Sequence, residues 1–206
     1  VTLCSSDDDE ALPDRAKVKF TPRSGRVGHQ PGKQKLRCST RTAQGSVAAH
    51  LSNCDSAVNL WTLGWRSFGC KYEYNFDALL DGPGGVLKKL KFKGVPEMDI
   101  YLDCRMLKDK ASVCLLGHCG RNNGILRNMV KDKHFRGLIT DVKRALAAHM
   151  ANKDLQSEAF DILCMFTSGC HRSVGLSYLL EHCIRTDGYT AHTKHLCESA
   201  WNGLLF

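Results

Sequence analysis

The hydrophobic positions of the chain fall into short continuous runs and into longer stretches with helical spacing. Residues 160–166 form an apolar run of strand length that only Asp161 interrupts, which predicts a buried central strand. Apolar, β-prone runs at 58–65 and 100–104 predict two more strands. Helical spacing follows directly over 173–183. The stretch 160–183 therefore predicts a strand, a loop and a helix in succession.

Two further segments carry the spacing of an amphipathic helix. Between Phe135 and His149, apolar residues recur every three or four positions on one face, and a shorter helix is predicted over 125–130. Strands and helices thus alternate along the chain. This order predicts an α/β fold, with a single domain in which helices flank a mixed or parallel sheet.

The first part of the chain has a different composition. Residues 7–10 are acidic, and residues 15–41 carry many Lys and Arg among Gly, Ser and Pro, with no apolar period. Such a segment buries too little surface to offset its ordering entropy. We therefore expect a disordered polybasic arm over 1–57 and a folded domain over 58–206. The arm either binds nucleic acid electrostatically or is a solvated tail.

Positive charge is a feature of the folded part as well. The sequence at 81–85 is a Gly- and Pro-rich turn, and the lysine-rich segment after it is interpreted as a surface insertion. The whole chain has a formal net charge of +8 and a pI near 9.0, which indicates affinity for polyanions. The residues that we expect to contact RNA are Lys88, Lys89, Lys91, Lys93, Arg172 and Lys194.

The chain has eleven cysteines, an odd number that cannot all pair internally. Several, such as Cys104, Cys164 and Cys183, lie in apolar runs, where a free cysteine packs as a small hydrophobe. We expect the cytoplasm or another reducing compartment. No run reaches the length of a membrane span. The nearest candidates for a zinc site, His118 with Cys119 and Cys170 with His171, are adjacent pairs without zinc-ligand spacing, so no metal is expected. No cofactor is expected either.

The loop between the central strand and its helix, 167–173, carries the chemistry of an oxyanion site. It combines hydroxyls, a glycine, an imidazole and a guanidinium. Backbone N–H groups at a helix start favour anions, Gly169 permits close backbone approach, and Arg172 offers a planar fork of donors. The positive end of the helix dipole repels a guanidinium at the helix N-terminus, unless a bound anion compensates for this repulsion. Ser173 is alternatively a simple N-cap.

Two known phosphate loops do not fit this one. The Walker pattern is absent from the chain, which excludes a P-loop nucleotide triphosphatase. In cysteine phosphatases the nucleophile stands at a fixed distance before the arginine, and that position is Phe166 here. The enzyme alternative is therefore a phosphatase or phosphotransferase that uses Cys170 or His171, with Arg172 as phosphate clamp.

Four segments resemble one known family in the same order. Residues 167–174, Thr-Ser-Gly-Cys-His-Arg-Ser-Val, are similar to the T-G-G-x-H-R-S-V loop of the C-terminal domain of RapZ, the bacterial RNase adapter family. Residues 67–71, 102–107 and 192–196 resemble its S-F-G-[FY]-K, F-D-x-R-x-L and S-R-H-R-x-L segments. The resemblance implies an α/β domain likened to a phosphofructokinase-type subdomain. It also implies binding of a phosphorylated amino sugar and of structured RNA that is presented to a nuclease, without catalysis.

The sequence also departs from that family. The nucleotide-binding domain with its Walker loop has no counterpart, so ATP or GTP binding is not implied. Residues 108–110 replace an N-P-aromatic segment, and Tyr72 stands where the family often has His. Ser168 and Cys170 replace the loop's first Gly and an often basic position. The identity of the sugar phosphate therefore stays open.

The resemblance and the loop together assign the ligand-binding residues. They are Lys71, Asp103, Arg105, Thr167, Ser168, Gly169, Cys170, His171, Arg172, Ser173 and His195. An alternative to the ligand role stays open in two cases. Asp103 and Arg105 could form a structural ion pair, and His195 could be a surface residue near a frayed end. The expected function is a non-catalytic module for a sugar phosphate and RNA, with a nuclease partner and no membrane. A scaffold with an empty pocket and a homo-oligomer are not excluded.

Overall fold

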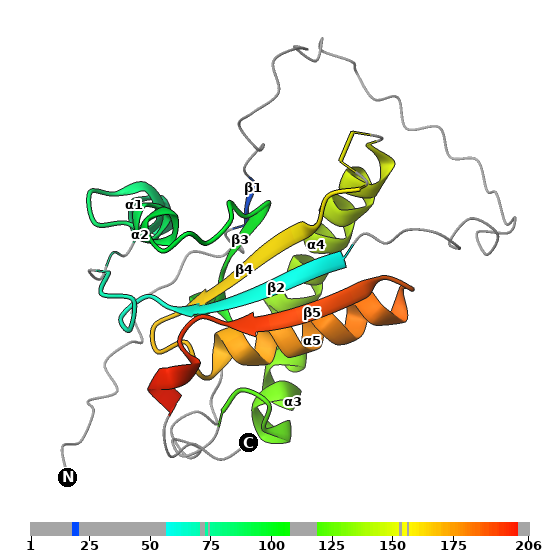
Figure 1. The fold of residues 1–206 in the computed structure, drawn as a ribbon. Helices are drawn as coiled ribbons and strands as arrows, with labels where there is room; N and C mark the ends of the chain where they lie inside the picture. Colours follow the sequence, from blue (N-terminus) through cyan, green and yellow to red (C-terminus); the bar gives the residue numbers. More distant parts are fainter. Residues whose placement is uncertain are drawn as a thin grey trace, which may run out of the picture.

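The fold is built on a five-stranded mixed sheet. The protein's structure, a computed structural model, describes residues 18–20, 57–70, 73, 75–107, 119–152, 154–155 and 157–201. The strands are β1 (Val18–Phe20), β2 (Ala57–Gly64), β3 (Ile100–Asp103), β4 (Phe160–Phe166) and β5 (Thr190–His195), in the spatial order β1-β3-β4-β2-β5 (Figure 1). β3, β4, β2 and β5 are parallel, and β1 is antiparallel to β3. The predicted α/β class is confirmed.

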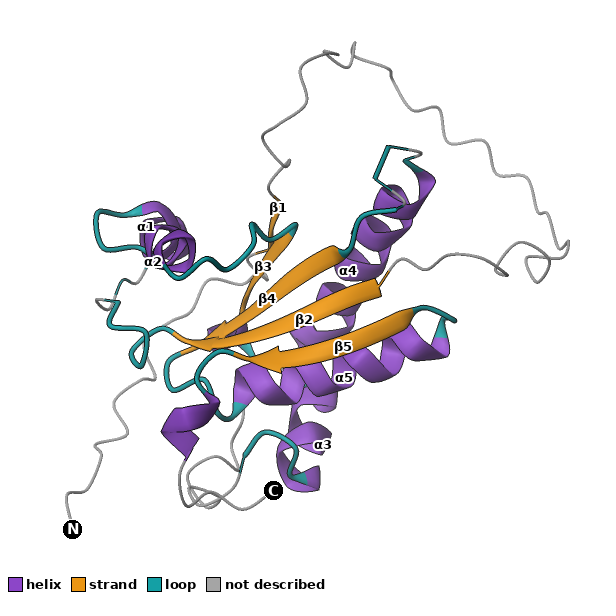
Figure 2. Cartoon of the chain, viewed as in Figure 1, coloured by secondary structure: helices purple, strands orange, loops and turns teal. Residues whose placement is uncertain are grey.

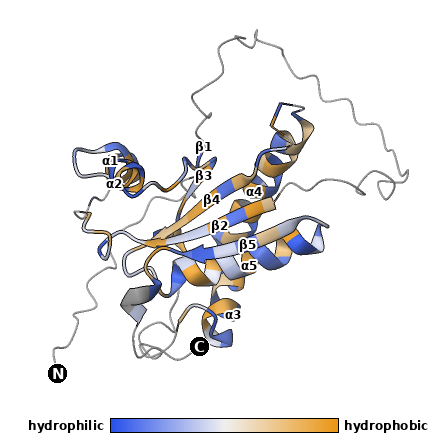
Figure 3. Cartoon of the chain, in the orientation of Figure 1, coloured by the Kyte–Doolittle hydropathy of each residue, from blue (hydrophilic) through white to orange (hydrophobic). Residues whose placement is uncertain are grey.

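β4 lies at the centre of the sheet, as its apolar sequence predicted. In its register, Ile162 lies between Leu60 of β2 and Ile100 of β3. A parallel strand with neighbours on both sides and helices over both faces needs such a near-continuous apolar run. β5 is different: only Ala191 of this strand is buried, and Figure 3 shows it as largely hydrophilic. The sequence analysis did not predict β5, because an edge strand with this polar composition has no apolar pattern.

Three helices pack on one face of the sheet (Figure 2). They are α3 (Asn123–Lys131), α4 (Lys133–Ala151) and α5 (Arg172–Thr186). The caps explain where the first two begin, because the side chains of Asn122 and Asp132 accept hydrogen bonds from Gly124 N and His134 N. The predicted stripe of α4 from Phe135 to His149 is buried against the sheet. All three predicted helices are therefore confirmed, with α3 and α4 longer than their apolar patterns.

The opposite face is covered by two short helices and the turn after β2. α1 (Phe76–Asp81) and α2 (Val86–Phe92) bury Leu80, Val86 and Leu90 in a second core with Leu63 and Leu163 of the sheet. Two 3-10 turns, η1 (Cys104–Met106) and η2 (Glu198–Trp201), follow β3 and β5. The lysine-rich segment interpreted as a surface insertion is thus a helix with one packed side, since Val86 and Leu90 lie one turn apart.

β1 comes from the segment expected to form the polybasic arm. Val18, Lys19 and Phe20 pair with Leu102, Tyr101 and Ile100 of β3. The ammonium of Lys19 contacts the carboxylates of Asp77 and Asp81. These three residues belong to the sheet, which the analysis of composition did not predict. The rest of 1–56 lies outside the described residues, so the boundary at residue 57 stays a prediction.

The cysteines that the structure describes are free thiols. Cys104 and Cys164 are fully buried and Cys183 is half-buried, so the predicted packing role holds for the first two. Burial and the neighbouring Cys164 raise the pKa of Cys104 well above its ordinary value. Among the described residues, no helix combines the length and apolar character that a membrane span requires.

Candidate anion-binding site

The carboxyl ends of β2 and β4 are neighbours, and the chain leaves them toward opposite faces of the sheet. After Gly64 it continues into the turn 65–70 and then α1, whereas after Phe166 it continues through 167–171 into α5 (Figure 1). In open α/β sheets, ligands bind outside the strand ends at such a switch point. The predicted loop therefore lies at the position where this fold class places its binding sites.

Two glycines let the loop pack directly on β2. Gly169 has a φ of +74°, and a Cβ on it would lie 2.4 Å from Gly64 N. Conversely, a Cβ on Gly64 would lie 2.4 Å from the carbonyl oxygen of Ser168. The sequence analysis assigned Gly169 to close approach of a ligand. The structure gives a different reason, because Gly169 needs both the left-handed conformation and the space against β2.

The N-terminus of α5 opens beside this packed loop. The helix begins at Arg172, its N-cap is His171, and neither a side-chain cap bond nor an acidic residue in the first turn is present among the described residues. Ser173 is fully buried inside the first turn, so the alternative that it is the N-cap is wrong. Its Oγ has no hydrogen-bond partner within the described part of the chain. A 15-residue helix thus carries a partial positive charge to the switch point.

Gly120 closes the other side of the helix start. Its N–H donates to the carbonyl oxygen of Cys170 (2.8 Å), and a Cβ on it would lie 2.0 Å from the carbonyl oxygen of His171. The segment that leads into α3 therefore touches the loop. The sequence analysis missed Gly120, since nothing in the local pattern around residue 120 indicates a contact with residue 171.

Arg172 extends from the helix start toward the end of β3. Its Nη1 donates to the carbonyl oxygen of Arg105 (3.3 Å), and its guanidinium lies 4.6 Å from the centre of the Phe166 ring. These contacts give the arginine protein partners at a place where the helix dipole disfavours a cation. The side chain is half-buried, and these contacts hold it in place.

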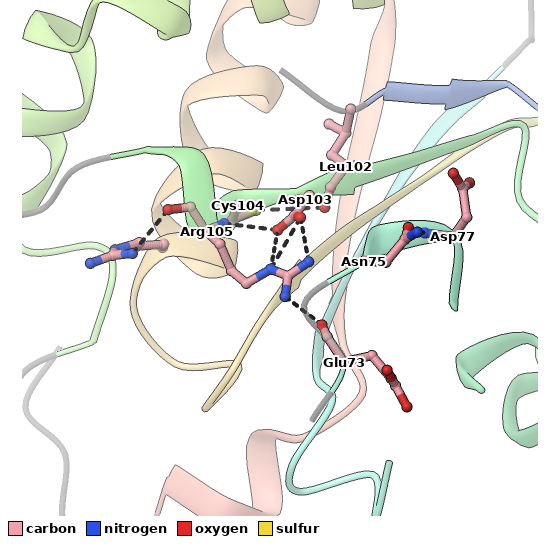
Figure 4. A network of polar contacts seen from close by, with 8 residues as sticks. Glu73, Asn75, Asp77, Leu102, Asp103, Cys104 and Arg105 are labelled. Atoms are coloured by element: carbon pink, nitrogen blue, oxygen red, sulfur yellow. Dashed lines mark hydrogen bonds and ion pairs between the residues drawn. The ribbon is translucent and has the colours of Figure 1, made fainter. Parts of the chain in front are cut away.

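Asp103 and Arg105 form a tight ion pair at the end of β3 (Figure 4). Nε and Nη2 of Arg105 donate to the carboxylate at 2.7 to 3.1 Å, and Nη1 donates to the carbonyl oxygen of Glu73 (2.7 Å). Both side chains are about nine-tenths buried. The structural ion pair, one of the two alternatives for these residues, is therefore present. A ligand role for either residue stays a prediction.

Cys170 and its neighbours form a polar cluster inside the loop. The thiol of Cys170 donates to Oγ of Ser168 at 3.2 Å. Burial alone would raise the pKa of this thiol, but hydrogen bonding with His171 and Ser168, with the charge of His171, lowers it below its ordinary value. Thr167 is half-buried next to them, and its carbonyl oxygen accepts from Arg66 N (3.2 Å). The loop thus contains a hydrogen-bonded thiol whose pKa is lower than that of an ordinary cysteine.

His195 lies at the end of β5, on the same edge of the sheet. Its Nδ1 is 2.8 Å from Oγ1 of Thr62, its Nε2 is 3.4 Å from Nη2 of Arg121, and its ring packs on Trp201. Burial, with the positive charge of Arg121, lowers the pKa of His195, which favours the neutral form of the ring. The alternative of a surface residue near a frayed end is wrong. Arg121, which sequence reasoning missed, is exposed next to Gly120.

The family comparison agrees with this geometry. The profile of the RapZ C-terminal domain matches residues 89–198, more than half of the chain. The chain belongs to this family. The matched range runs from α2 to the start of η2 and contains the loop 167–173. No curated protein sequence matches the chain.

The RapZ C-terminal domain profile leaves part of the candidate site outside its range. β2, the turn 65–70 and α1 precede residue 89, although the turn contacts the matched loop through Thr167. Lys71, which the resemblance assigned to the ligand site, lies outside the described residues. The described residues contain no group of three His, Cys, Asp or Glu side chains that could hold a metal ion.

Four of the lysines predicted to contact RNA lie at α2 and divide into two groups. Lys89 donates to the carbonyl oxygens of Phe68 (3.2 Å) and Gly69, and the ammonium of Lys93 lies 4.5 Å above the Phe68 ring. These two hold α2 against the turn after β2. Lys88 and Lys91 are exposed on the other side of the helix.

Lys194 lies apart from the α2 lysines. It is exposed on β5, with its ammonium 4.7 Å from the centre of the Trp61 ring. Successive strand residues point to opposite faces, so Lys194 lies across the sheet from His195.

Proposed function

We propose that this RapZ C-terminal domain is a non-catalytic binding module for a small phosphorylated ligand, a sugar phosphate, and for RNA. The observation that carries the proposal is the start of α5. A long helix begins at a switch point of the sheet, without a side-chain cap or a first-turn acid among the described residues. Backbone N–H groups in this arrangement favour a phosphate. The family resemblance supports an amino sugar phosphate as the ligand.

The polar side chains around the loop support such a role. Arg172 provides a fork of donors, and the hydroxyls of Thr167 and Ser168 are half-buried beside it. In this proposal Arg105 and Asp103 position Arg172, because the carbonyl oxygen of Arg105 accepts from its guanidinium. His195, neutral and half-buried, could accept a hydrogen bond from a sugar hydroxyl after exchanging its contact with Arg121.

The protein partners follow the same resemblance. We infer that the domain presents bound RNA to a nuclease, as an RNase adapter does. The domain assigned to 58–206, completed by β1, would bind both the ligand and RNA, and the rest of 1–57 would be a basic arm that adds electrostatic affinity for RNA. Limited proteolysis that leaves a stable fragment starting near residue 57 would support this division. Cleavage within 58–206 before the arm is removed would contradict it.

Thermal stability tests the small-ligand site. A ligand that binds only the folded state raises the melting temperature, by about 5–10 °C at a hundredfold excess over Kd for a domain of this size. We expect such a shift with sugar phosphates and its loss in Arg172→Ala. Arg185→Ala is the matched control, since Arg185 lies at the far end of α5 in an ion pair with Glu181. Absence of any shift with sugar phosphates, nucleotides or phosphate would refute the site.

One observation favours an enzyme as the second candidate. The lowered pKa of Cys170 makes a thiolate more accessible next to Arg172, which is what a phosphatase or phosphotransferase needs. In that case a thiolate would attack phosphorus and the released alcohol would leave with a proton from a nearby acid such as His171. Phosphate release that is lost in both Cys170→Ser and His171→Ala would favour this candidate. Inactivity on varied phosphoesters would leave the binding module.

A further inference from the structure

The outer side of α2 carries an aromatic ring among lysines. Phe92 is 92% exposed, far more than any other large apolar side chain in the described residues. Lys88 precedes it by one helical turn, so the two side chains are neighbours on the helix surface. Lys91 is exposed on the same outer side. A single exposed apolar residue is common, but this one lies within a cluster of cations.

The inner side of α2 holds this cluster in a fixed place. Val86 and Leu90 are buried in the core on that face of the sheet. Lys89 bonds to the carbonyl oxygen of Phe68, and Lys93 lies over the Phe68 ring. The helix is therefore anchored by one side, and Lys88, Lys91 and Phe92 are presented to solvent on a rigid element. An aromatic side chain has only two χ angles, so it loses little conformational entropy when another flat ring stacks on it.

We propose that this face, made of Lys88, Lys91 and Phe92, binds single-stranded RNA by stacking an unpaired base on Phe92. The inference rests on the proposed RNA binding and specifies which form of RNA it recognises at α2. The ammonium groups of the two lysines would contact the phosphates on either side of the stacked base. Base stacking on an aromatic side chain accepts any base, whereas an A-form duplex keeps its base faces covered.

An anionic membrane is the other polyanion that attracts a basic, aromatic surface. α2 fits this partner poorly. It has seven residues, its apolar residues Val86 and Leu90 are already buried in the domain, and Phe92 alone is left to enter a bilayer. An interfacial helix needs a whole apolar face for that purpose. The face of α2 therefore fits RNA.

The test compares Phe92→Ala with wild type on a short single-stranded oligouridylate and on a duplex RNA of the same length, by fluorescence anisotropy. Loss of one stacked base is expected to weaken binding of the single strand by about 5- to 150-fold. Binding of the duplex should change by less than about 2-fold, because no base is stacked there. Phe92→Trp should keep the affinity for the single strand. Tyr178→Ala, a half-exposed aromatic residue on α5, is the matched control and should change neither.

A salt titration separates stacking from charge. Replacing Lys88 and Lys91 by Gln should reduce the slope of log affinity against log salt, whereas Phe92→Ala should leave the slope unchanged. Equal binding of the single strand by wild type and Phe92→Ala would overturn the stacking site but not the proposed RNA binding. Failure of wild type to bind either RNA would overturn both. Phe92-dependent binding to phosphatidylserine vesicles in place of RNA would assign the surface to a membrane.

Discussion

At the scale of single residues, the candidate site depends on backbone contacts that exclude side chains. Gly64, at the end of β2, faces Gly169 in the loop. Gly120 lies equally close to the backbone of His171. These glycines bring three segments together around the start of α5. The sequence analysis recognised the conformational freedom of Gly169 but assigned it to a ligand, because the neighbour across the sheet is more than one hundred residues away in the chain.

Replacing Gly169 by Ala should therefore destabilise the fold. The new Cβ would meet Gly64 N at 2.4 Å with a φ of +74°, and we expect a loss of at least about 2 kcal/mol in the free energy of unfolding, measured with urea. The control is Gly137→Ala on the exposed side of α4, where a Cβ meets nothing within 4 Å. That change should stabilise by about 0.5–1 kcal/mol. Similar effects of the two substitutions would contradict the packing account.

Cys170 should react at lower pH than an ordinary thiol. Its lowered pKa means that the thiolate, which is the reactive form, is present at pH values where an unperturbed cysteine is still protonated. The rate of alkylation of its peptide by iodoacetamide, followed by mass spectrometry, should rise with pH around a midpoint below that of the unfolded chain. His171→Ala should move the midpoint upward, since the hydrogen bond from His171 is lost. An unchanged midpoint would show that His171 does not stabilise the thiolate.

At the scale of elements, the ends of the parallel strands supply the parts of the site. β4 provides the loop, β3 ends in the pair Asp103 and Arg105, and β5 ends in His195. Arg105 also reaches the segment before α1 through the carbonyl oxygen of Glu73 (Figure 4). Because the pair is buried and all three guanidinium nitrogens of Arg105 donate hydrogen bonds, it stiffens the end of β3 beside Arg172.

Asp103→Ala should cost much more stability than the loss of an exposed ion pair. It leaves the buried guanidinium of Arg105 without its carboxylate, which is expected to cost about 3–5 kcal/mol in the free energy of unfolding. Asp141→Ala removes the exposed pair with Arg144 and should change stability by less than about 0.5 kcal/mol. Urea unfolding of both variants measures the difference. A loss below about 1 kcal/mol in the free energy of unfolding for Asp103→Ala would mean that the ion pair does not stabilise the end of β3.

The elements that the sequence predicted are those with a dense apolar pattern. β2, β3, β4, α3, α4 and α5 bury a continuous run or a regular stripe, and each was predicted from it. β1 was missed because three residues are too few to show a pattern, and β5 was missed because it is polar and buries only Ala191. α2 was taken for a surface insertion because its two buried residues are too few to give a period.

At the scale of the whole molecule, the turn 65–70 links the candidate anion site on one face of the sheet to α2 on the opposite face. The turn 65–70 touches the loop through Arg66 N and Thr167 O, and it touches α2 through Lys89. The loop itself could be predicted from its residue types and from the helix start. The contacts of Arg172 with Arg105 and of His195 with Thr62 and Arg121 could not, because they join segments that only the strand order brings together.

The most direct test of the account is where a sugar phosphate binds, measured by amide chemical shifts in a ¹H–¹⁵N spectrum during titration. Binding at the helix start should shift the amides of residues 169–174 first and most strongly, with a weaker response at His195, and Arg172→Ala should abolish both. The claim that the N-terminus of α5 is a phosphate site would be contradicted if the shifted amides all lay on other surfaces. It would also be contradicted if no amide shifted during the titration.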